Sequence, residues 1–289
     1  MENSILFIGL GVMGYHMAGH LSKQEDTTVY NRTSAKAYQW QKEFDGHVLE
    51  NLQEIPNNIK IIITCIGNDN DLREVYLSDT GLLKKCKKGT ILIDHTTASA
   101  NIAREISSAA TQQQHVFFDA PISGGEQGAI NGVLTTMCGG DAASFETIKP
   151  ILQCYSKAVT LMGDNGSGQL TKMVNQIAVA GVVQGLSEAI HFAQQAGLDC
   201  HQVIDVISNG AAQSWQMENR AATMIKGEYE HGFAVDLMRK DLDICLTQAR
   251  ALGAKLPTTA LIDQFYADIQ ALGGNRWDTS SLLERLRDK

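Results

Sequence analysis

The stretch "GSGQLTKMVNQ", residues 166–176, brings together polar side chains that could do chemistry. Lys172, Asn175 and Gln176 lie in an otherwise apolar segment with helical periodicity. Residues three and four apart share a helix face, so both amides flank the lysine. A solvated helix face would also explain a lone lysine. Whether this polar face does chemistry depends on the motifs elsewhere in the chain.

The composition excludes several classes of protein. The chain has 289 residues, 44% of them hydrophobic and 19% charged, which indicates a soluble globular protein long enough for two domains. A net charge of -8 argues against nucleic acid or an anionic membrane as partner. Six cysteines without a CxxC pair indicate free thiols in a reducing cytoplasm, and we expect no metal site.

A glycine motif near the amino terminus predicts a dinucleotide site. In "IGLGVMGYHMAGHL", the residues Gly9, Gly11 and Gly14 form G-x-G-x-x-G directly between a predicted strand and a predicted helix. The glycines allow a tight turn, a close approach of backbone N–H groups to a pyrophosphate, and close helix–strand packing. We expect the whole loop to bind the cofactor, including Leu10, Val12 and Met13.

The end of the second predicted strand favours NADP over NAD. An NAD site has a carboxylate there for the ribose hydroxyls. This chain reads "VYNRTSAK", with the neutral Asn31 followed by Arg32 and Thr33, which can bind a 2′-phosphate. NAD stays possible, because an arginine in a surface turn needs no ligand.

Two further strand ends offer cofactor contacts. "TCIGNDNDL" supplies Cys65, Ile66 and Gly67 as an apolar wall, and "IDHTTASA" supplies Thr96 and Thr97. In open α/β sheets, ligands bind outside the carboxyl ends of the strands. Either threonine could instead cap the helix that follows.

A serine and two glycines form a candidate carboxylate seat in "DAPISGGEQGAINGVL". Ser123, Gly124 and Gly125 follow a predicted strand, so two backbone N–H groups and a hydroxyl can converge on an anionic oxygen. An ordinary strand-to-helix turn would have the same spacing.

These sites need a parallel sheet to position them. Short apolar, β-branched strands alternate with helical segments through the first half of the chain, which predicts a doubly wound, Rossmann-type α/β sheet. The expected strands are Ile5–Gly9, Thr28–Asn31, Lys60–Ile66, Thr90–His95 and Val116–Ile122, and two pieces, "VLTTMCGG" and "AVTLMG", are expected as edge strands around a helix at Ala142–Tyr155.

From Gly166 onward the pattern is helical throughout. We therefore expect a dinucleotide-binding domain at residues 1–164 and an all-α domain at residues 165–289, which begins with a long interdomain helix. A site at this junction would lie between the two domains, where small-molecule clefts often form.

Four motifs in order make the chain resemble the β-hydroxyacid dehydrogenase family, which includes 3-hydroxyisobutyrate dehydrogenases, tartronate semialdehyde reductases and glyoxylate or succinic semialdehyde reductases. The motifs are "GLGVMG", "DAPISGG", "GSGQLTKMVNQ" and "FAVDLMRKDL" at Phe233–Leu242. The resemblance covers nearly the whole chain. It implies an NAD(P)-dependent oxidoreductase that is a homodimer or homotetramer and acts on a small carboxylate-bearing substrate.

The resemblance also implies residue roles. Lys172 would be the catalytic general acid and base, with Asn175 bound to the same substrate oxygen. The second amide of the pair is Gln176 where many relatives have asparagine, so either amide could orient the substrate. The resemblance further implies that Ser123, Gly124 and Gly125 hold the substrate carboxylate. It implies that Thr97 lies beside nicotinamide and substrate and that Lys240 contacts the cofactor. Phe233 and Asp241 would order the pocket, with Trp215 as a further pocket wall.

Three alternatives stay open at this stage. A 6-phosphogluconate dehydrogenase-like enzyme shares the lysine-bearing helix but is much longer, and imine reductases usually lack the lysine. A non-catalytic NADP-binding module would keep the fold without turnover.

Overall fold

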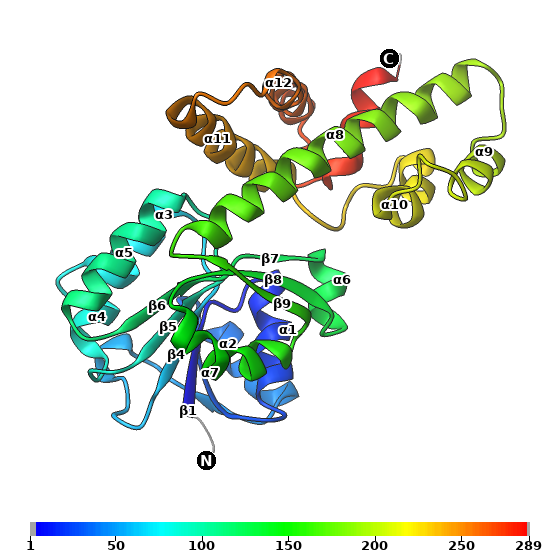
Figure 1. Ribbon diagram of the computed structural model, residues 1–289. Coiled ribbons are helices and arrows are strands. Elements are labelled where there is room, and N and C mark those ends of the chain that lie inside the picture. The colour runs from blue at the N-terminus through cyan, green and yellow to red at the C-terminus, as the bar shows by residue number, and fades with distance from the viewer. Residues whose placement is uncertain (1–3, 288–289) are drawn as a thin grey trace. The chain divides into compact units, whose positions relative to one another are not determined.

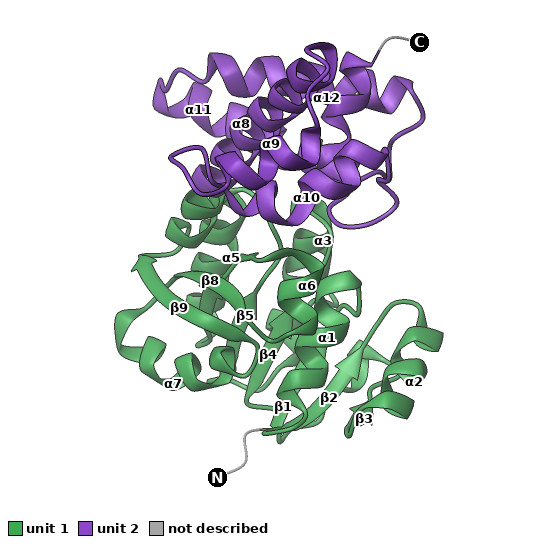
Figure 2. Cartoon of the chain, turned by 90° about the vertical axis from the view of Figure 1, so that its right-hand side faces the viewer, with its two compact units in different colours: residues 1–172 green, residues 173–289 purple. Residues whose placement is uncertain are grey.

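The computed structural model describes residues 4–287, and the chain divides into two compact units at Lys172 and Met173 (Figure 2). The division falls within the long helix α8 (Ser167–Gln195), whose first turns belong to the first unit. Each unit has its own hydrophobic core.

The first unit is built on one mixed sheet with the strand order β3-β2-β1-β4-β5-β6-β8-β7, and β9 pairs with β8. The ladder from β3 to β6 is parallel throughout, whereas β8 runs antiparallel to β6 and β7 and parallel to β9. The strands are β1 (Ser4–Ile8), β2 (Asp26–Tyr30), β3 (His47–Val48), β4 (Ile61–Thr64), β5 (Ile91–Asp94), β6 (Val116–Asp119), β7 (Ile122–Ser123), β8 (Leu134–Gly139) and β9 (Ser156–Gly163).

Helices cover both faces of this sheet (Figure 1). Side chains alternate along a strand, so Ile5 and Phe7 of β1 pack on one face and Leu6 and Ile8 on the other. The first face is covered by α1 (Val12–Leu21), α2 (Ser34–Glu43), α6 (Gly125–Ile130) and α7 (Ala142–Gln153), and the second by α3 (Asp69–Leu72), the π-helical turn η2 (Arg73–Leu77), α4 (Leu82–Lys85) and α5 (Ala100–Gln112), while a 3-10 turn η1 (Leu52–Glu54) precedes β4. The predicted doubly wound α/β class is confirmed.

Two details of the predicted sheet are wrong. The expected strand Val116–Ile122 ends at Asp119, and the chain resumes at Ile122 as β7, which pairs with β8 in the antiparallel direction. Pro121 lies in the gap, and proline cannot donate a ladder hydrogen bond. The piece "VLTTMCGG" was expected at an edge, but its strand β8 pairs with β6, β7 and β9. The two-residue strand β3 is too short to show a pattern in the sequence.

The second unit is helical, as the sequence predicts. Its helices are the remainder of α8, α9 (Cys200–Ile207), α10 (Trp215–Lys226), α11 (Val235–Leu252), α12 (Pro257–Ala271) and a 3-10 segment η3 (Thr279–Leu286). One core joins α8, α11 and α12, and a second joins α8, α10 and η3. Among residues 4–287, no helix has both the length and the apolar character needed to cross a membrane.

Candidate active site

The glycine loop lies between β1 and α1, as the motif predicts, and its three glycines differ in their surroundings. Gly9 has φ +102°, and a Cβ there would lie 2.2 Å from the carbonyl oxygen of Cys65. A Cβ on Gly14 would lie 2.0 Å from the carbonyl oxygen of Gly9. Gly11 is the N-cap residue of α1, and a Cβ there would meet no atom within 4 Å. Gly9 and Gly14 therefore allow the loop to close, and Gly11 leaves an open approach to the amino terminus of a helix, which fits a phosphate group.

Asn31 holds the glycine loop from the neighbouring strand. Its side-chain oxygen accepts a hydrogen bond from the backbone N–H of Leu10 at 2.9 Å, and its amide donates to the carbonyl oxygen of Thr33 at 3.0 Å. Arg32 and Thr33 are exposed just before α2, and Thr33 is the N-cap residue of that helix. A neutral amide suits both contacts, because a carboxylate at this position could not donate to Thr33.

Hydrogen bonds join the ends of β4 and β5. The backbone N–H of Ile66 donates to the hydroxyl of Thr96 at 3.0 Å, and that hydroxyl donates to Asp94 at 2.7 Å. Asp94 also accepts from the hydroxyl of Thr64 at 2.7 Å. Asp94 is buried, and burial outweighs these hydrogen bonds and raises its pKa to about 7. Thr96 is therefore a structural link between strands, whereas Thr97 is half-buried at the start of the next loop.

The end of β6 and the first turn of α8 are joined through Asp119. This buried carboxylate accepts from the backbone N–H of Gly166 at 2.7 Å and from that of Gln169 at 3.0 Å. Burial raises the pKa of Asp119 to about 6, although these backbone hydrogen bonds act in the opposite direction. Lys172 follows one turn later in α8, with 8% of its surface exposed.

The predicted carboxylate seat forms a strand-to-helix turn. Ser123 ends β7 and is half-buried, while Gly124 and Gly125 are exposed with φ +133° and +64°. Such positive φ values are strained for residues other than glycine. The turn therefore depends on both glycines, and it leaves their backbone accessible before α6.

The two amides next to Lys172 in sequence have different environments. Gln176 is buried, accepts from the amide of Asn175 at 2.8 Å and donates to Asp241 at 2.7 Å. Asp241 also pairs with Lys240 at 3.2 Å. Gln176 thus connects Asn175 to α11, and of the two amides only Asn175 is partly exposed.

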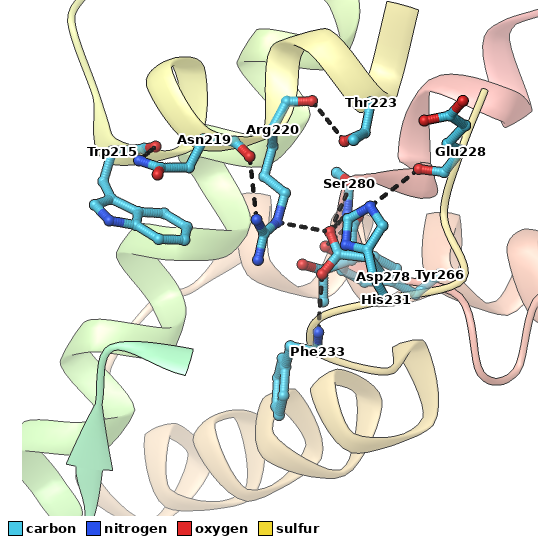
Figure 3. Close-up of polar contacts among 11 residues, drawn as sticks. Trp215, Asn219, Arg220, Thr223, Glu228, His231, Phe233, Tyr266, Asp278 and Ser280 are labelled. Atoms are coloured by element: carbon cyan, nitrogen blue, oxygen red, sulfur yellow. Dashed lines mark hydrogen bonds and ion pairs between the residues drawn. The ribbon is translucent and has the colours of Figure 1, made fainter. Parts of the chain in front are cut away.

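The two predicted aromatic residues of the second unit are linked to a buried carboxylate, Asp278, one directly and one through an arginine (Figure 3). Asp278 accepts from the backbone N–H of Phe233 at 2.8 Å and pairs with the guanidinium of Arg220 at 3.3 Å. The guanidinium carbon of Arg220 lies 5.0 Å from the ring centre of Trp215. Trp215 is 47% exposed, so it is not a core residue of this unit.

Four residues with supporting contacts were not predicted from the sequence: Asp94, Asp119, Gln169 and Asp278. Asp94 and Asp119 are the last residues of parallel strands, and this position was a usable signal. Gln169 and Asp278 carried no signal, because their partners are distant in sequence. Within residues 4–287, no group of three or more His, Cys, Asp or Glu side chains could hold a metal ion.

Comparison with known proteins identifies the family. Residues 4–163 match the family described as the NAD binding domain of 6-phosphogluconate dehydrogenase, and residues 166–286 match the one described as NAD-binding of NADP-dependent 3-hydroxyisobutyrate dehydrogenase. The chain belongs to the β-hydroxyacid dehydrogenase family. It is an NAD(P)-dependent oxidoreductase of that family, and the glycine loop lies within the residues that match the NAD binding domain.

Similar members of the β-hydroxyacid dehydrogenase family match nearly end to end. An uncharacterized oxidoreductase of Shewanella frigidimarina is 57% identical over 98% of this chain and 97% of its own length. The 2-hydroxy-3-oxopropionate reductase of Escherichia coli is 33% identical, with 97% and 96% covered. The solved structure of 3-hydroxyisobutyrate dehydrogenase with L-serine from Mycobacterium tuberculosis is 26% identical and has a TM-score of 0.89, with both chains covered completely.

Proposed function

We propose that this dehydrogenase interconverts a small β-hydroxy acid and the corresponding aldehydic or keto acid with NADP(H), and that Lys172 is its general acid and base. The observation that carries the proposal is the position of Lys172. It is buried one turn beyond the point where α8 is hydrogen-bonded to the carboxyl end of β6. Ligands of such sheets bind at this edge.

Lys172 would move the hydroxyl proton. When bound, the nicotinamide accepts or supplies the hydride. In the oxidative direction, the Lys172 amine takes the proton from the substrate hydroxyl as the C–O bond becomes a carbonyl. In the reductive direction, the ammonium returns that proton to the new alkoxide oxygen. A general acid and base of this kind contributes typically about 10²–10⁴-fold to the rate.

Asn175 is the amide best suited to bind the same substrate oxygen. It is partly exposed, and it lies three residues after Lys172 on α8, on the same helix face. Gln176 is buried and bonded to both Asn175 and Asp241. Gln176 and Asp241 would therefore orient Asn175, and Lys240 would be oriented by Asp241 toward its proposed role at the cofactor.

The cofactor would be bound by the loop from Gly9 to Gly14 and by the strand ends at Cys65, Ile66, Gly67 and Thr97. NADP is proposed over NAD because Asn31 is neutral and committed to the loop, while Arg32 and Thr33 are exposed beside it. A guanidinium and a hydroxyl can bind a 2′-phosphate by charge-assisted hydrogen bonds. The description of the matching carboxyl-terminal family as NADP-dependent agrees with this choice.

The substrate carboxylate would be held by Ser123, Gly124 and Gly125. The exposed backbone of the two glycines and the half-buried serine hydroxyl can donate to an anion. Trp215 and Phe233 are proposed to contact the rest of the substrate. One relative is named 2-hydroxy-3-oxopropionate reductase. A similar solved structure is that of a 3-hydroxyisobutyrate dehydrogenase with L-serine, itself a β-hydroxy acid. We propose a substrate of this class.

We also propose a homo-oligomer in the cytoplasm. Val174, Val182 and Phe192 of α8 are 65%, 40% and 72% exposed, and their spacing aligns them along one side of the helix. An apolar stripe of this kind is what a second copy would cover. The cysteines are scattered along the sequence without a CxxC pair, which suits a protein in a reducing compartment.

The test measures initial rates of NADPH and NADH oxidation with tartronate semialdehyde, methylmalonate semialdehyde, succinic semialdehyde and glyoxylate. The parent is compared with Lys172→Met and with Lys255→Met, a control that removes an exposed lysine. We expect turnover of at least one acid with NADPH, a loss of roughly 10²–10⁴-fold in kcat for Lys172→Met, and parent activity for the control. Full activity of Lys172→Met would contradict the assigned role, and NADPH binding without turnover of any acid would favour a non-catalytic module.

A further inference from the structure

The side chain of Gln169 links α8 to the loop after β5. Its amide nitrogen donates to the carbonyl oxygen of Thr96 at 2.7 Å, and its amide oxygen accepts from the backbone N–H of Ala98 at 3.1 Å. These two backbone groups lie on either side of Thr97. With 1% of its surface exposed, Gln169 is enclosed by protein and holds both contacts without competition from water.

The backbone of the same helical turn is held by Asp119 through Gly166 and Gln169. A carboxylate at this point satisfies helix N–H groups that have no partner within the helix, and it interacts favourably with the helix dipole. Close packing adds a geometric constraint, because a Cβ on Gly168 would lie 2.4 Å from the carbonyl oxygen of Met137 and 2.5 Å from that of Asp119. The first turn of α8 is therefore fixed against both β6 and β8.

A third contact fixes β5 to β6 next to this point. One ring nitrogen of His95, Nδ1, donates to the carbonyl oxygen of Ala120 at 2.6 Å, so the other accepts from the hydroxyl of Tyr155 at 2.8 Å. Burial lowers the pKa of His95 to about 4, which keeps the ring neutral and this pattern of donors intact. The ends of β5, β6 and α8 thus form one hydrogen-bonded unit.

We propose that Asp119 and Gln169 are positioning residues that fix Lys172 relative to Thr97. The inference rests on the proposed function, in which Lys172 moves the proton and Thr97 lies beside the reacting groups. Gln169 precedes Lys172 by three residues on the same helix, so a shift of the first turn moves both residues together. Neither positioning residue takes or gives a proton in the reaction.

The role predicts a specific kinetic defect. Misplacement of a reacting group by about 1 Å can cost about 10²-fold in rate. Gln169→Met keeps the length of the side chain but removes both hydrogen bonds to the Thr97 segment. We expect kcat to fall by roughly 10–100-fold, while the affinity for NADPH and the folded fraction stay near those of the parent.

The experiment compares Gln169→Met with the parent and with Gln184→Met, a matched control that removes another buried glutamine of α8, bonded there to Glu188. Rates are measured with NADPH and with NADPH deuterated at the transferred position, on the best acid of the panel above. Slower hydride transfer makes that step rate-limiting, so the isotope effect on kcat should rise in Gln169→Met alone. Hydrogen exchange of the Ala98 amide should also accelerate in that variant alone.

A merely structural role gives a different result. Partial unfolding lowers the concentration of active enzyme, so kcat would fall without a change in the isotope effect. That result, or unchanged exchange at Ala98, would overturn the inference. Asp119→Asn provides a second variant, because it places an amide group where the carboxylate accepts from two backbone N–H groups. An unchanged isotope effect in both variants would likewise overturn the inference.

The outcome is separable from the fate of the proposed function. If Lys172→Met is inactive while both positioning variants behave like the parent, only the present inference fails. If Lys172→Met is fully active, the proposed function fails, and this inference fails with it.

Discussion

The three glycines of the dinucleotide loop should respond differently to alanine. At Gly11 the added methyl group meets no protein atom, and φ is -74°, which any residue adopts. Alanine there restricts the unfolded chain, a gain of about 0.4–1 kcal/mol, but it is a poorer N-cap residue than glycine by a similar amount. The free energy of unfolding of Gly11→Ala should therefore stay within about 1 kcal/mol of the parent value.

The same substitution at Gly9 or Gly14 should destabilise the fold before any ligand is added. The new Cβ would lie 2.2 Å from the carbonyl oxygen of Cys65 in the first case and 2.0 Å from that of Gly9 in the second. Overpacking of this kind costs typically about 1–3 kcal/mol and sometimes more, and the positive φ of Gly9 adds strain of about 1–2 kcal/mol. For a domain of this size, each kcal/mol lowers Tm by about 2–4 °C.

The affinity for the cofactor should fall in Gly11→Ala although the stability of that variant does not. Gly11→Ala should fold like the parent and still lose binding, because its methyl group occupies the space by which a pyrophosphate approaches the backbone. The loss of one hydrogen bond to a charged group is worth roughly 1.5–3 kcal/mol, which corresponds to about 10–100-fold in Kd.

Thermal melting and fluorescence titration with NADPH measure the two effects. Gly210→Ala serves as control, since its Cβ would lie 3.5 Å from the nearest atom, an ordinary contact outside the dinucleotide loop. Parent affinity in Gly11→Ala would refute the assignment of this loop to the pyrophosphate. Parent Tm in Gly9→Ala or Gly14→Ala would refute the close backbone contacts described above.

Three further predictions follow from the other sites. Arg32→Ala should raise KM for NADPH by roughly 10-fold or more, the value of one charge-assisted contact, with little change for NADH; equal effects on both cofactors would exclude a 2′-phosphate contact. Because the folded-state pKa of Asp94 is raised to about 7 from an ordinary 3.8, its stabilising contribution is complete below about pH 4 and is lost as the pH rises through about 7. Denaturant titrations should thus show the stability of the parent relative to Asp94→Asn falling by on the order of 4 kcal/mol between pH 4 and pH 8, and a pH-independent difference would show that Asp94 titrates normally. Phe192→Glu should shift the sedimentation coefficient toward that of a monomer, and an unchanged coefficient would remove this face of α8 from any interface.

Local patterns were sufficient for the parallel part of the fold. Buried parallel strands are apolar on both faces, so β1, β4 and β5 were visible as short β-branched runs. The strand–glycine–helix arrangement likewise predicted the glycine loop between β1 and α1, because Gly9 and Gly14 meet requirements of the local chain geometry. Where pairing depends on distant segments, as for β7 and β8, the sequence carried no usable signal.

The sequence by itself determined the class of fold, the family and the residue types available for chemistry, including Lys172, because these depend on periodicity and on motifs read along the chain. Only the tertiary structure decided which polar residues support which others. The pairing of Asp119 with the first turn of α8, and of Gln169 with Thr96 and Ala98, joins segments about 50 to 70 residues apart. The tertiary structure also buries Gln176 and leaves Asn175 partly exposed, although these adjacent amides look equivalent in the sequence. Contacts and solvent access of this kind exist only once the chain has folded.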